Sequence, residues 1–398
     1  MELERNFNGA RLKEGRIYRG YTISDIAAEL GVTKQMISKY ENENNNVAPT
    51  FEALLQLTRI LNFPKEYFYE EPIPIKTGNT YFRSLLTTGK KEREMQFDRV
   101  KYLTIIRAML EEYVDFPELD VPEIPDKYLD DVEKAANKLR EYWNLGDKPI
   151  KNMVYLLESK GFAITSMTLG KKNIDAFGSH HEVNGKQYYS IVLGNEKRSF
   201  YRRQFDVAHE LGHKVLHDPY MDINDLSKEE FKQIEQEAND FAAALLLPKD
   251  AFLREVSIHP NDLSYYVLLK KRWNVSIGAM VMRAYKLGAI TDGTYQYMQR
   301  QISQKGWRKS EPLDDIKEVN DPVSMKQAVE LLIENDYATG EELVQKLSQH
   351  YGLSLNREEI EDLLGLDRGY LRTEDTPVLD NIVSLKDRYE ARNKNNMG

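Results

Sequence analysis

The stretch His209–His213 reads HELGH, two histidines four residues apart around a glutamate. On a helix, positions i and i+4 lie on one face, so both imidazoles can reach one ion. Neutral imidazole suits Zn²⁺, and Glu210 could act as general base for a water that attacks a carbonyl. The alternative is a surface helix that carries two histidines by chance. Three of the chain's seven histidines, the third being His217, lie in or just after this stretch, which favours a metal site.

A candidate third ligand lies on a second apolar helix, predicted over 234–248. Glu235 and Ala238 share one stripe of this helix, and small residues there allow two helices to approach closely. Asn239 follows Glu235 at i+4 and is expected to hold a ligating side chain in place. Glu237 is the rival ligand on a different face, and we prefer Glu235. An amphipathic helix with surface glutamates is the alternative for the whole segment.

The composition of the 398 residues limits the possible chemistry and suggests two to four domains at about 100–200 residues each. The chain has no cysteine, which excludes a disulfide scaffold, a cysteine-ligated metal and a thiol nucleophile. Histidine and carboxylate must therefore hold any transition metal. No apolar run approaches about 18 residues, and the N-terminus lacks the apolar core of a signal peptide, so we expect a cytoplasmic protein with no membrane partner. The net charge of −9 argues against a nucleic-acid coat but allows a local basic surface.

A helix-turn-helix pattern lies near the N-terminus, where Ala27, Gly31 and Ile37 have the required spacing. A small alanine lets two helices cross, Gly31 takes the left-handed turn, and Ile37 packs the second helix onto the first. The outward residues of that second helix are candidates to read base edges: Lys34, Gln35, Ser38 and Lys39. Arg16 and Arg19 are candidates to bind phosphate. The alternative is a helical interaction domain with ordinary surface charges.

The segments around these two motifs have simpler signals. Residues 71–80 contain two prolines and a Gly-Asn pair, and they are predicted to form a linker. Asn184-Gly185 predicts a hairpin between strands over 173–183 and 186–193. An edge strand of this hairpin could align an extended peptide, or the hairpin could be purely structural.

The two metal motifs, in this order and spacing, resemble the ImmA/IrrE family of bacterial zinc metallopeptidases over about 150–290. The resemblance implies a thermolysin-like (gluzincin) α+β domain with a small antiparallel sheet. It implies these roles: Zn²⁺ ligands His209, His213 and Glu235, and general base Glu210. His217 matches a further family histidine, expected beside the ligands or facing the substrate. The family pattern also favours Glu235 over Glu237.

The N-terminal motif resembles the XRE (lambda-repressor-like) helix-turn-helix family over about 8–70. The resemblance includes the Ser38-Lys-Tyr-Glu41 ending and the loop at Pro49. One departure is Ile23, which stands where the family often has a glutamine that contacts phosphate or a base. The resemblance implies binding to a double-stranded DNA operator.

We therefore expect a mainly α-helical chain with four parts. These are an XRE-type DNA-binding domain (8–70), a linker and helical connector (71–149), a zinc peptidase domain (150–290) and a helical C-terminal region of unknown role (291–398). Fused XRE–ImmA/IrrE chains occur in bacteria and phages, which implies regulation by cleavage of a repressor, an antitoxin or the chain's own linker. The rival hypothesis is a transcription factor or antitoxin whose peptidase-like domain senses a ligand and cuts nothing. A homodimer is expected because helix-turn-helix proteins usually read two half-sites.

Overall fold

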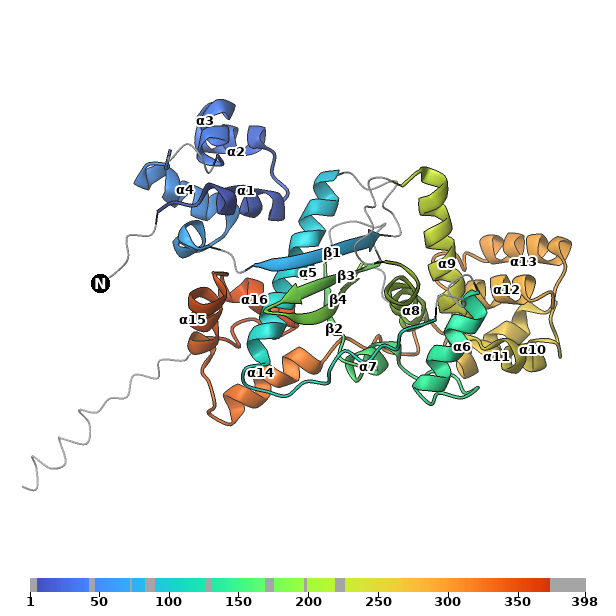
Figure 1. The fold of residues 1–398 in the computed structure, drawn as a ribbon. Coiled ribbons are helices and arrows are strands. Elements are labelled where there is room, and N and C mark those ends of the chain that lie inside the picture. The colour runs from blue at the N-terminus through green and yellow to red at the C-terminus, as the bar shows by residue number, and fades with distance from the viewer. Residues whose placement is uncertain are drawn as a thin grey trace, which may run out of the picture.

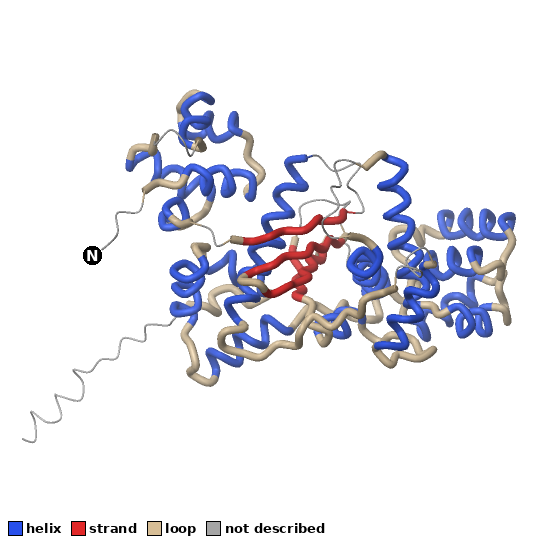
Figure 2. The backbone as a smooth tube through the Cα atoms, in the orientation of Figure 1, coloured by secondary structure: helices blue, strands red, loops and turns tan. Residues whose placement is uncertain are grey.

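The computed structural model describes residues 6–42, 47–71, 74–82, 90–125, 131–168, 175–196, 199–218 and 226–372. This part of the chain is mainly α-helical, as the sequence predicts, and a small sheet lies among the helices (Figures 1 and 2). The strands are β1 (Ile75–Phe82), β2 (Ala163–Met167), β3 (Ala176–Val183) and β4 (Lys186–Gly194). The helices are α1 (Gly9–Tyr18), α2 (Ile23–Leu30), α3 (Lys34–Tyr40), α4 (Phe51–Leu61), the 3-10 helix η1 (Lys65–Tyr69), α5 (Lys90–Leu110), α6 (Val132–Tyr142), α7 (Met153–Glu158), α8 (Phe200–Leu216), α9 (Lys228–Leu246), α10 (Lys249–Val256), α11 (Leu263–Trp273), α12 (Ile277–Lys286), α13 (Asp292–Gln304), α14 (Ser324–Glu334), α15 (Gly340–Tyr351) and α16 (Arg357–Leu364). None of the described helices is long and apolar enough to cross a membrane.

The predicted helix-turn-helix domain comprises α1 to α4 and η1. Thr22 caps α2, and its side chain and that of Asp25 bond reciprocally to each other's backbone amides. Gly31 ends α2 with a φ of 68°, in the left-handed region that a glycine adopts without strain. Thr33 caps α3, and the predicted packing residue Ile37 is fully buried. The local signals in the sequence therefore mark the helix ends correctly.

The sheet has the strand order β1-β3-β4-β2. Asn184 and Gly185 join β3 to β4 with positive φ at both residues, as the predicted two-residue hairpin requires. The pairs β1-β3 and β3-β4 are antiparallel, as the predicted small antiparallel sheet requires, whereas β2 pairs parallel to β4, so the complete sheet is mixed. The chain reverses direction before β3 and again before β4, and β4 therefore runs in the direction of β2 beside it. In this order β4 is an inner strand and offers no free edge to a peptide.

The segment predicted to be a linker contains the edge strand β1, which pairs antiparallel with β3. The prediction of a linker over 71–80 is therefore wrong for the residues from Ile75 onward. Pro74 lies just before the strand, where a missing amide does no harm. The register shifts between Thr77 and Thr80, so Gly78 falls on a bulge. Pro74 and Gly78, which would disturb the middle of a regular strand, thus lie at positions that an edge strand tolerates.

Two hydrophobic cores lie on opposite faces of the sheet. Phe177 and Val192 contribute to the first core, which also contains residues of α1 to α5 and α14 to α16. Tyr189 and Ile191, at alternate positions of β4, contribute to the second core with α6 to α13. The described end of the C-terminal region therefore shares a core with the helix-turn-helix domain. Figure 1 shows α15 and α16 beside the N-terminal helices and α10 to α13 at the opposite end of the molecule.

Candidate metal centre and nucleic-acid interface

Helices α8 and α9 pack closely and bring the three predicted metal ligands together. His209 Nε2 and His213 Nε2 lie 3.1 Å apart. The carboxylate of Glu235 lies 3.5 Å from His209 Nε2 and 3.3 Å from His213 Nε2. The two helices approach at Gly212, where a Cβ would lie 3.1 Å from the Cα of Ala238. The small residues at this crossing are therefore what lets α9 deliver its carboxylate to α8.

The three side chains fit a zinc ion. In tetrahedral zinc, bonds of about 2.0–2.1 Å place neighbouring ligand atoms about 3.3–3.4 Å apart. The three separations scatter closely around that value, and the ligand atoms all lie within 4.8 Å of one another. Both carboxylate oxygens of Glu235 are buried without a hydrogen-bond partner among the described residues. Such burial is costly unless a cation compensates it.

The electrostatics of the cluster favour the protonation states that bind a metal. Burial lowers the pKa of His213 to about 3, so its imidazole is neutral at pH 7. Burial alone would raise the pKa of Glu235, but its interactions with His209 and His213 outweigh burial and hold that pKa below its usual value. The site therefore contains neutral imidazole and an ionised carboxylate, which are the forms that ligate zinc.

Glu210, the predicted general base, follows His209 on α8, lies against Gly178 of β3 and is 1% exposed. A Cβ on Gly178 of β3 would lie 2.8 Å from the Tyr189 ring and 3.2 Å from Glu210 Oε2, so a larger residue there would crowd both side chains. Tyr189 of β4 donates its hydroxyl to the backbone carbonyl of Glu210 at 3.2 Å. The sequence prediction missed Gly178 and Tyr189. Their signal was the Asn184-Gly185 turn, which fixes the register of β3 against β4 and hence the face they share.

Glu237, the rival ligand, contacts a different histidine. His217 Nδ1 lies 3.1 Å from His213 Nδ1, and His217 Nε2 lies 3.2 Å from Glu237 Oε2. This chain of contacts is satisfied when His213 Nδ1–H donates to His217 and His217 Nε2–H donates to Glu237. In this arrangement His213 Nε2 faces the other two candidate ligands. Asn239 donates to the backbone carbonyl of Glu235 at 2.7 Å, rather than to a ligating side chain.

The candidate DNA-reading residues all lie on the exposed face of α3: Lys34, Gln35, Ser38 and Lys39. The helix begins at its Thr33 cap and packs onto α2 through Ile37 and Tyr40, which are buried. Figure 1 shows α3 at the end of its domain that points away from the sheet. The described structure therefore leaves this face open to a large ligand.

The two arginines predicted to bind phosphate are engaged elsewhere. Arg16 is 9% exposed and donates twice to the carboxylate of Glu41, at 2.5 and 2.9 Å. Arg19 donates to Glu359 of α16 at 2.6 Å and to the Leu61 carbonyl at 2.8 Å. In this conformation Arg16 stabilises the domain and Arg19 fastens it to α16. Neither side chain is presented to phosphate, because each is committed to an internal partner.

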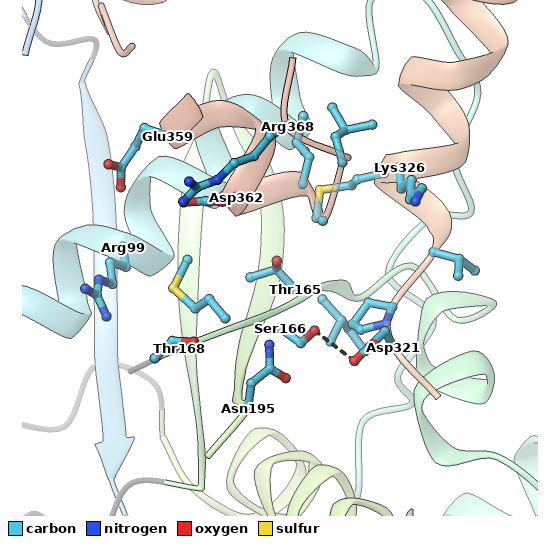
Figure 3. Close-up of a pocket in the computed structure, with 18 of the residues that line it drawn as sticks. Arg99, Thr165, Ser166, Thr168, Asn195, Asp321, Lys326, Glu359, Asp362 and Arg368 are labelled. Atoms are coloured by element: carbon cyan, nitrogen blue, oxygen red, sulfur yellow. Dashed lines mark hydrogen bonds between the residues drawn. The ribbon is translucent and has the colours of Figure 1, made fainter. Parts of the chain in front are cut away.

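A cavity of about 820 Å³ lies between the outer edge of β2, α14, α16 and the helix-turn-helix domain. None of the three candidate metal ligands lines it. Figure 3 shows its polar lining, in which Ser166 donates to Asp321 at 3.0 Å. Cationic and acidic side chains from different elements surround the same space: Arg19, Arg99, Lys326, Arg368, Glu330, Glu359 and Asp362. Its size is that of a small-molecule site.

Comparison with known protein families gives two matches. Residues 12–68 match the helix-turn-helix family, and residues 157–285 match a peptidase family described as the IrrE N-terminal-like domain. No curated protein matches the chain. The first match covers α2 and α3, and the second covers β2 to β4 together with α8 and α9. The architecture expected from the sequence is therefore present.

Proposed function

We propose that this chain, which joins an XRE-type helix-turn-helix domain to an IrrE/ImmA-like peptidase domain, is a DNA-binding transcriptional regulator with a zinc-dependent endopeptidase activity. Its substrate would be a repressor-type or antitoxin-type protein, or the chain itself, in a stress or phage-related response. The observation that carries the proposal is the buried triangle of His209, His213 and Glu235 with Glu210 beside it. A domain without hydrolytic activity has no need of a carboxylate at that place.

In this proposal each residue has a separate task. His209, His213 and Glu235 would hold the ion, which when bound supplies Lewis-acid polarisation of a peptide carbonyl. Glu210 would take the proton of the attacking water and pass it to the leaving amine. Tyr189 fixes the backbone of Glu210 through its hydroxyl. The task of His217 would be to orient His213.

The experiment that tests the metal site is elemental analysis of protein purified without added metal. We expect about one zinc per chain in the wild type and in Glu237→Gln. His213→Ala and Glu235→Gln should contain little or none. Folded wild-type protein without metal would overturn the zinc proposal.

The experiment that tests catalysis uses fluorescein-labelled casein as the probe. Glu210→Gln should keep its zinc and lose hydrolysis by a factor of roughly 100 or more, because the general base is removed while the ligands stay. Equal hydrolysis by wild type and Glu210→Gln would mean that a contaminating protease cuts the casein.

A second candidate function is ligand sensing without proteolysis, and the cavity of about 820 Å³ favours it. A ligand there would touch Arg19 of the DNA-binding domain and Glu359 of α16 at once. It could therefore alter how the two are fastened together. Under this alternative no peptide is cut, and Glu210→Gln changes neither DNA binding nor the response to a ligand.

A further inference from the structure

We propose that β1 is the resident occupant of the β3 edge along which the peptidase domain would align an extended substrate. The chain would then keep its own substrate groove closed. The inference rests on the proposed peptidase function, and it names the regulation and substrate class of that same site. Its basis is the position of β1 in the sheet, its distance from Glu210 and the weakness built into its pairing.

The first observation is that β1 covers an edge that belongs to another part of the chain. Without β1, the sheet built from residues 163–194 would have β3 as an open edge, since its order is β3-β4-β2. The strand comes from residues 75–82, outside the segment 157–285 that matches the peptidase family. An open edge presents unpaired amides and carbonyls that an added strand can satisfy. The strand β1, which belongs to the connector, thus occupies the position beside β3 that a substrate strand could occupy.

The second observation is that this edge passes the catalytic glutamate. Gly178 of β3 is the residue whose missing Cβ leaves room for Glu210 Oε2, and its pairing partner in β1 is Tyr81. Neighbouring strands lie about 4.8 Å apart, so the backbone at Tyr81 runs one strand spacing beyond Gly178. The start of β1, Ile75, pairs with Val183 at the far end of β3. A segment held this way reaches the candidate active site with its C-terminal end.

The third observation is that the pairing of β1 with β3 is interrupted. The register shift between Thr77 and Thr80 breaks the ladder in the middle of the strand, and a bulge leaves residues unpaired. The strand has one neighbour in the described sheet, since β3 is its only partner. A substrate strand with an unbroken ladder would therefore pair better with β3 than β1 does.

The pairing also indicates what the substrate resembles. It would be an extended segment antiparallel to β3, recognised mainly through its backbone. Lys76 of β1 lies opposite Glu182 of β3, and opposite charges at facing positions stabilise a strand pair. We therefore expect a preference for a basic residue at the position that faces Glu182.

The first test measures binding of a fluorescein-labelled peptide with the sequence of residues 74–82. The protein is the full chain with Glu210→Gln, so that the probe is not consumed. Thr80→Pro/Tyr81→Pro should open the edge. Of any two adjacent residues in an edge strand, one donates its amide to the neighbouring strand, and proline has no amide hydrogen to donate. We expect the opened variant to bind the peptide at least tenfold more tightly than the parent, which shares every residue except these two. The matched control Thr80→Ala/Tyr81→Ala keeps both amides and should behave like the parent.

A second variant keeps the proposal testable if the opened variant does not fold. The chain has no cysteine, so Lys76→Cys/Glu182→Cys can be joined selectively by the short thiol cross-linker dibromobimane. Facing residues of two strands have Cβ atoms about 4.5–5.5 Å apart, within reach of such a linker. Cross-linking should weaken binding of the peptide at least tenfold, while Lys76→Cys alone, treated identically, should show no change. Equal peptide binding with and without the cross-link would overturn the proposal.

Casein hydrolysis separates failure of this inference from failure of the proposed function. With Glu210 intact, the opened variant should hydrolyse casein at least tenfold faster than wild type. If the opened variant binds the peptide but no variant hydrolyses casein, the proposal for β1 is supported and the proposed peptidase function is wrong. If wild type and the folded opened variant hydrolyse casein equally, and the opened variant binds the peptide no more tightly than its parent, the peptidase function is supported and the proposal for β1 is wrong.

Discussion

Glu235 and Glu237 lie two residues apart on α9, yet they have different neighbours. The first faces both histidines of α8, and the second contacts His217, which in turn contacts His213. A helix turns by about 100° per residue, so side chains two positions apart point in nearly opposite directions. The choice between these ligands is therefore a matter of which face of α9 meets α8.

The contact between His217 and His213 leads to a prediction for metal affinity. We expect His217→Ala to weaken zinc binding roughly 10- to 100-fold, because a partner that orients a ligand is lost while all three ligands remain. A competition titration with a zinc-chelating dye measures this affinity. Glu229→Gln, an exposed substitution at the start of α9, is the control. An unchanged affinity in His217→Ala would show that His213 is held by its packing alone.

Asp98 of α5 leads to a prediction for the pH dependence of stability. Burial, reinforced by the nearby charge of Glu14, raises the pKa of Asp98 to about 8 in the folded chain. In the unfolded chain the group has its ordinary pKa of about 3.9. Between these values the unfolded state releases a proton that the folded state keeps, so this group's contribution to stability falls as pH rises from about 4 to 8.

Replacement of Asp98 by asparagine should remove this dependence. The melting temperature of Asp98→Asn should exceed that of wild type by an amount that grows between pH 5 and pH 8. The exposed Asp147→Asn is the control and should follow wild type at each pH. A constant difference between Asp98→Asn and wild type across this range would contradict the raised pKa.

At the scale of elements, the crossing of α8 and α9 depends on small residues. A larger side chain at Ala238, which is fully buried against Gly212, should push the helices apart. We expect Ala238→Leu to lower the free energy of unfolding by about 1–3 kcal/mol and to reduce bound zinc, since overpacking separates Glu235 from the histidines. Denaturant unfolding and metal analysis measure the two effects.

Ala243 on the same helix provides the matched control. It lines a second cavity, of about 600 Å³, between α8, α9 and α12, where a leucine has room. Ala243→Leu should therefore keep its zinc. Equal metal loss in both variants would mean that any leucine on this helix disturbs the site, whatever it faces.

Helix α3 leads to a prediction for DNA binding. Gln35→Ala should cost about 1–3 kcal/mol of binding to a sequence selected from a random duplex library, and should relax the preference at one position. Lys39→Ala should likewise weaken binding and relax the preference at another position, because Lys39 is also a candidate base-reading residue. Lys65→Ala, on η1 and 66% exposed, should have little effect. If Lys65→Ala weakened DNA binding as much as Gln35→Ala and Lys39→Ala do, α3 would not be the helix that reads the DNA.

At the scale of the whole molecule, the C-terminal helices fasten the DNA-binding domain to the sheet. Tyr18 and Arg19 both donate to the carboxylate of Glu359 in α16. At the other end of the domain, Glu70 is 2% exposed and accepts hydrogen bonds from Ser348 and Ser354. The region with no recognisable chemistry in its sequence therefore sets where the domain sits.

Charge reversal at Glu359 should loosen this arrangement. In Glu359→Lys the two donors lose their acceptor and Arg19 faces a like charge, so the domain should detach from α16. Small-angle X-ray scattering should then give a larger radius of gyration than for wild type. Glu358→Lys, at a neighbouring exposed position, is the control. Identical scattering from wild type and Glu359→Lys would show that the apolar core alone holds the domain.

The sequence by itself determined the features that depend on neighbours a few residues away. The caps at Thr22 and Thr33, the left-handed turn at Gly31, the hairpin at Asn184-Gly185 and the one-face pair His209/His213 are all of this kind. Their physical cause is contained within a few consecutive residues, through backbone conformation, capping bonds or helix periodicity. The two family matches extend this local information to the two domains.

Only the tertiary structure decided which distant surfaces cover one another. It placed Glu235 rather than Glu237 against the histidines, turned the supposed linker into β1, and committed Arg16 and Arg19 to internal partners. It also joined the C-terminal helices to the DNA-binding domain in one core. An apolar or charged face signals that it needs a partner, but it does not specify which one. That choice is made by the packing of the whole chain, because many faces satisfy the same local pattern.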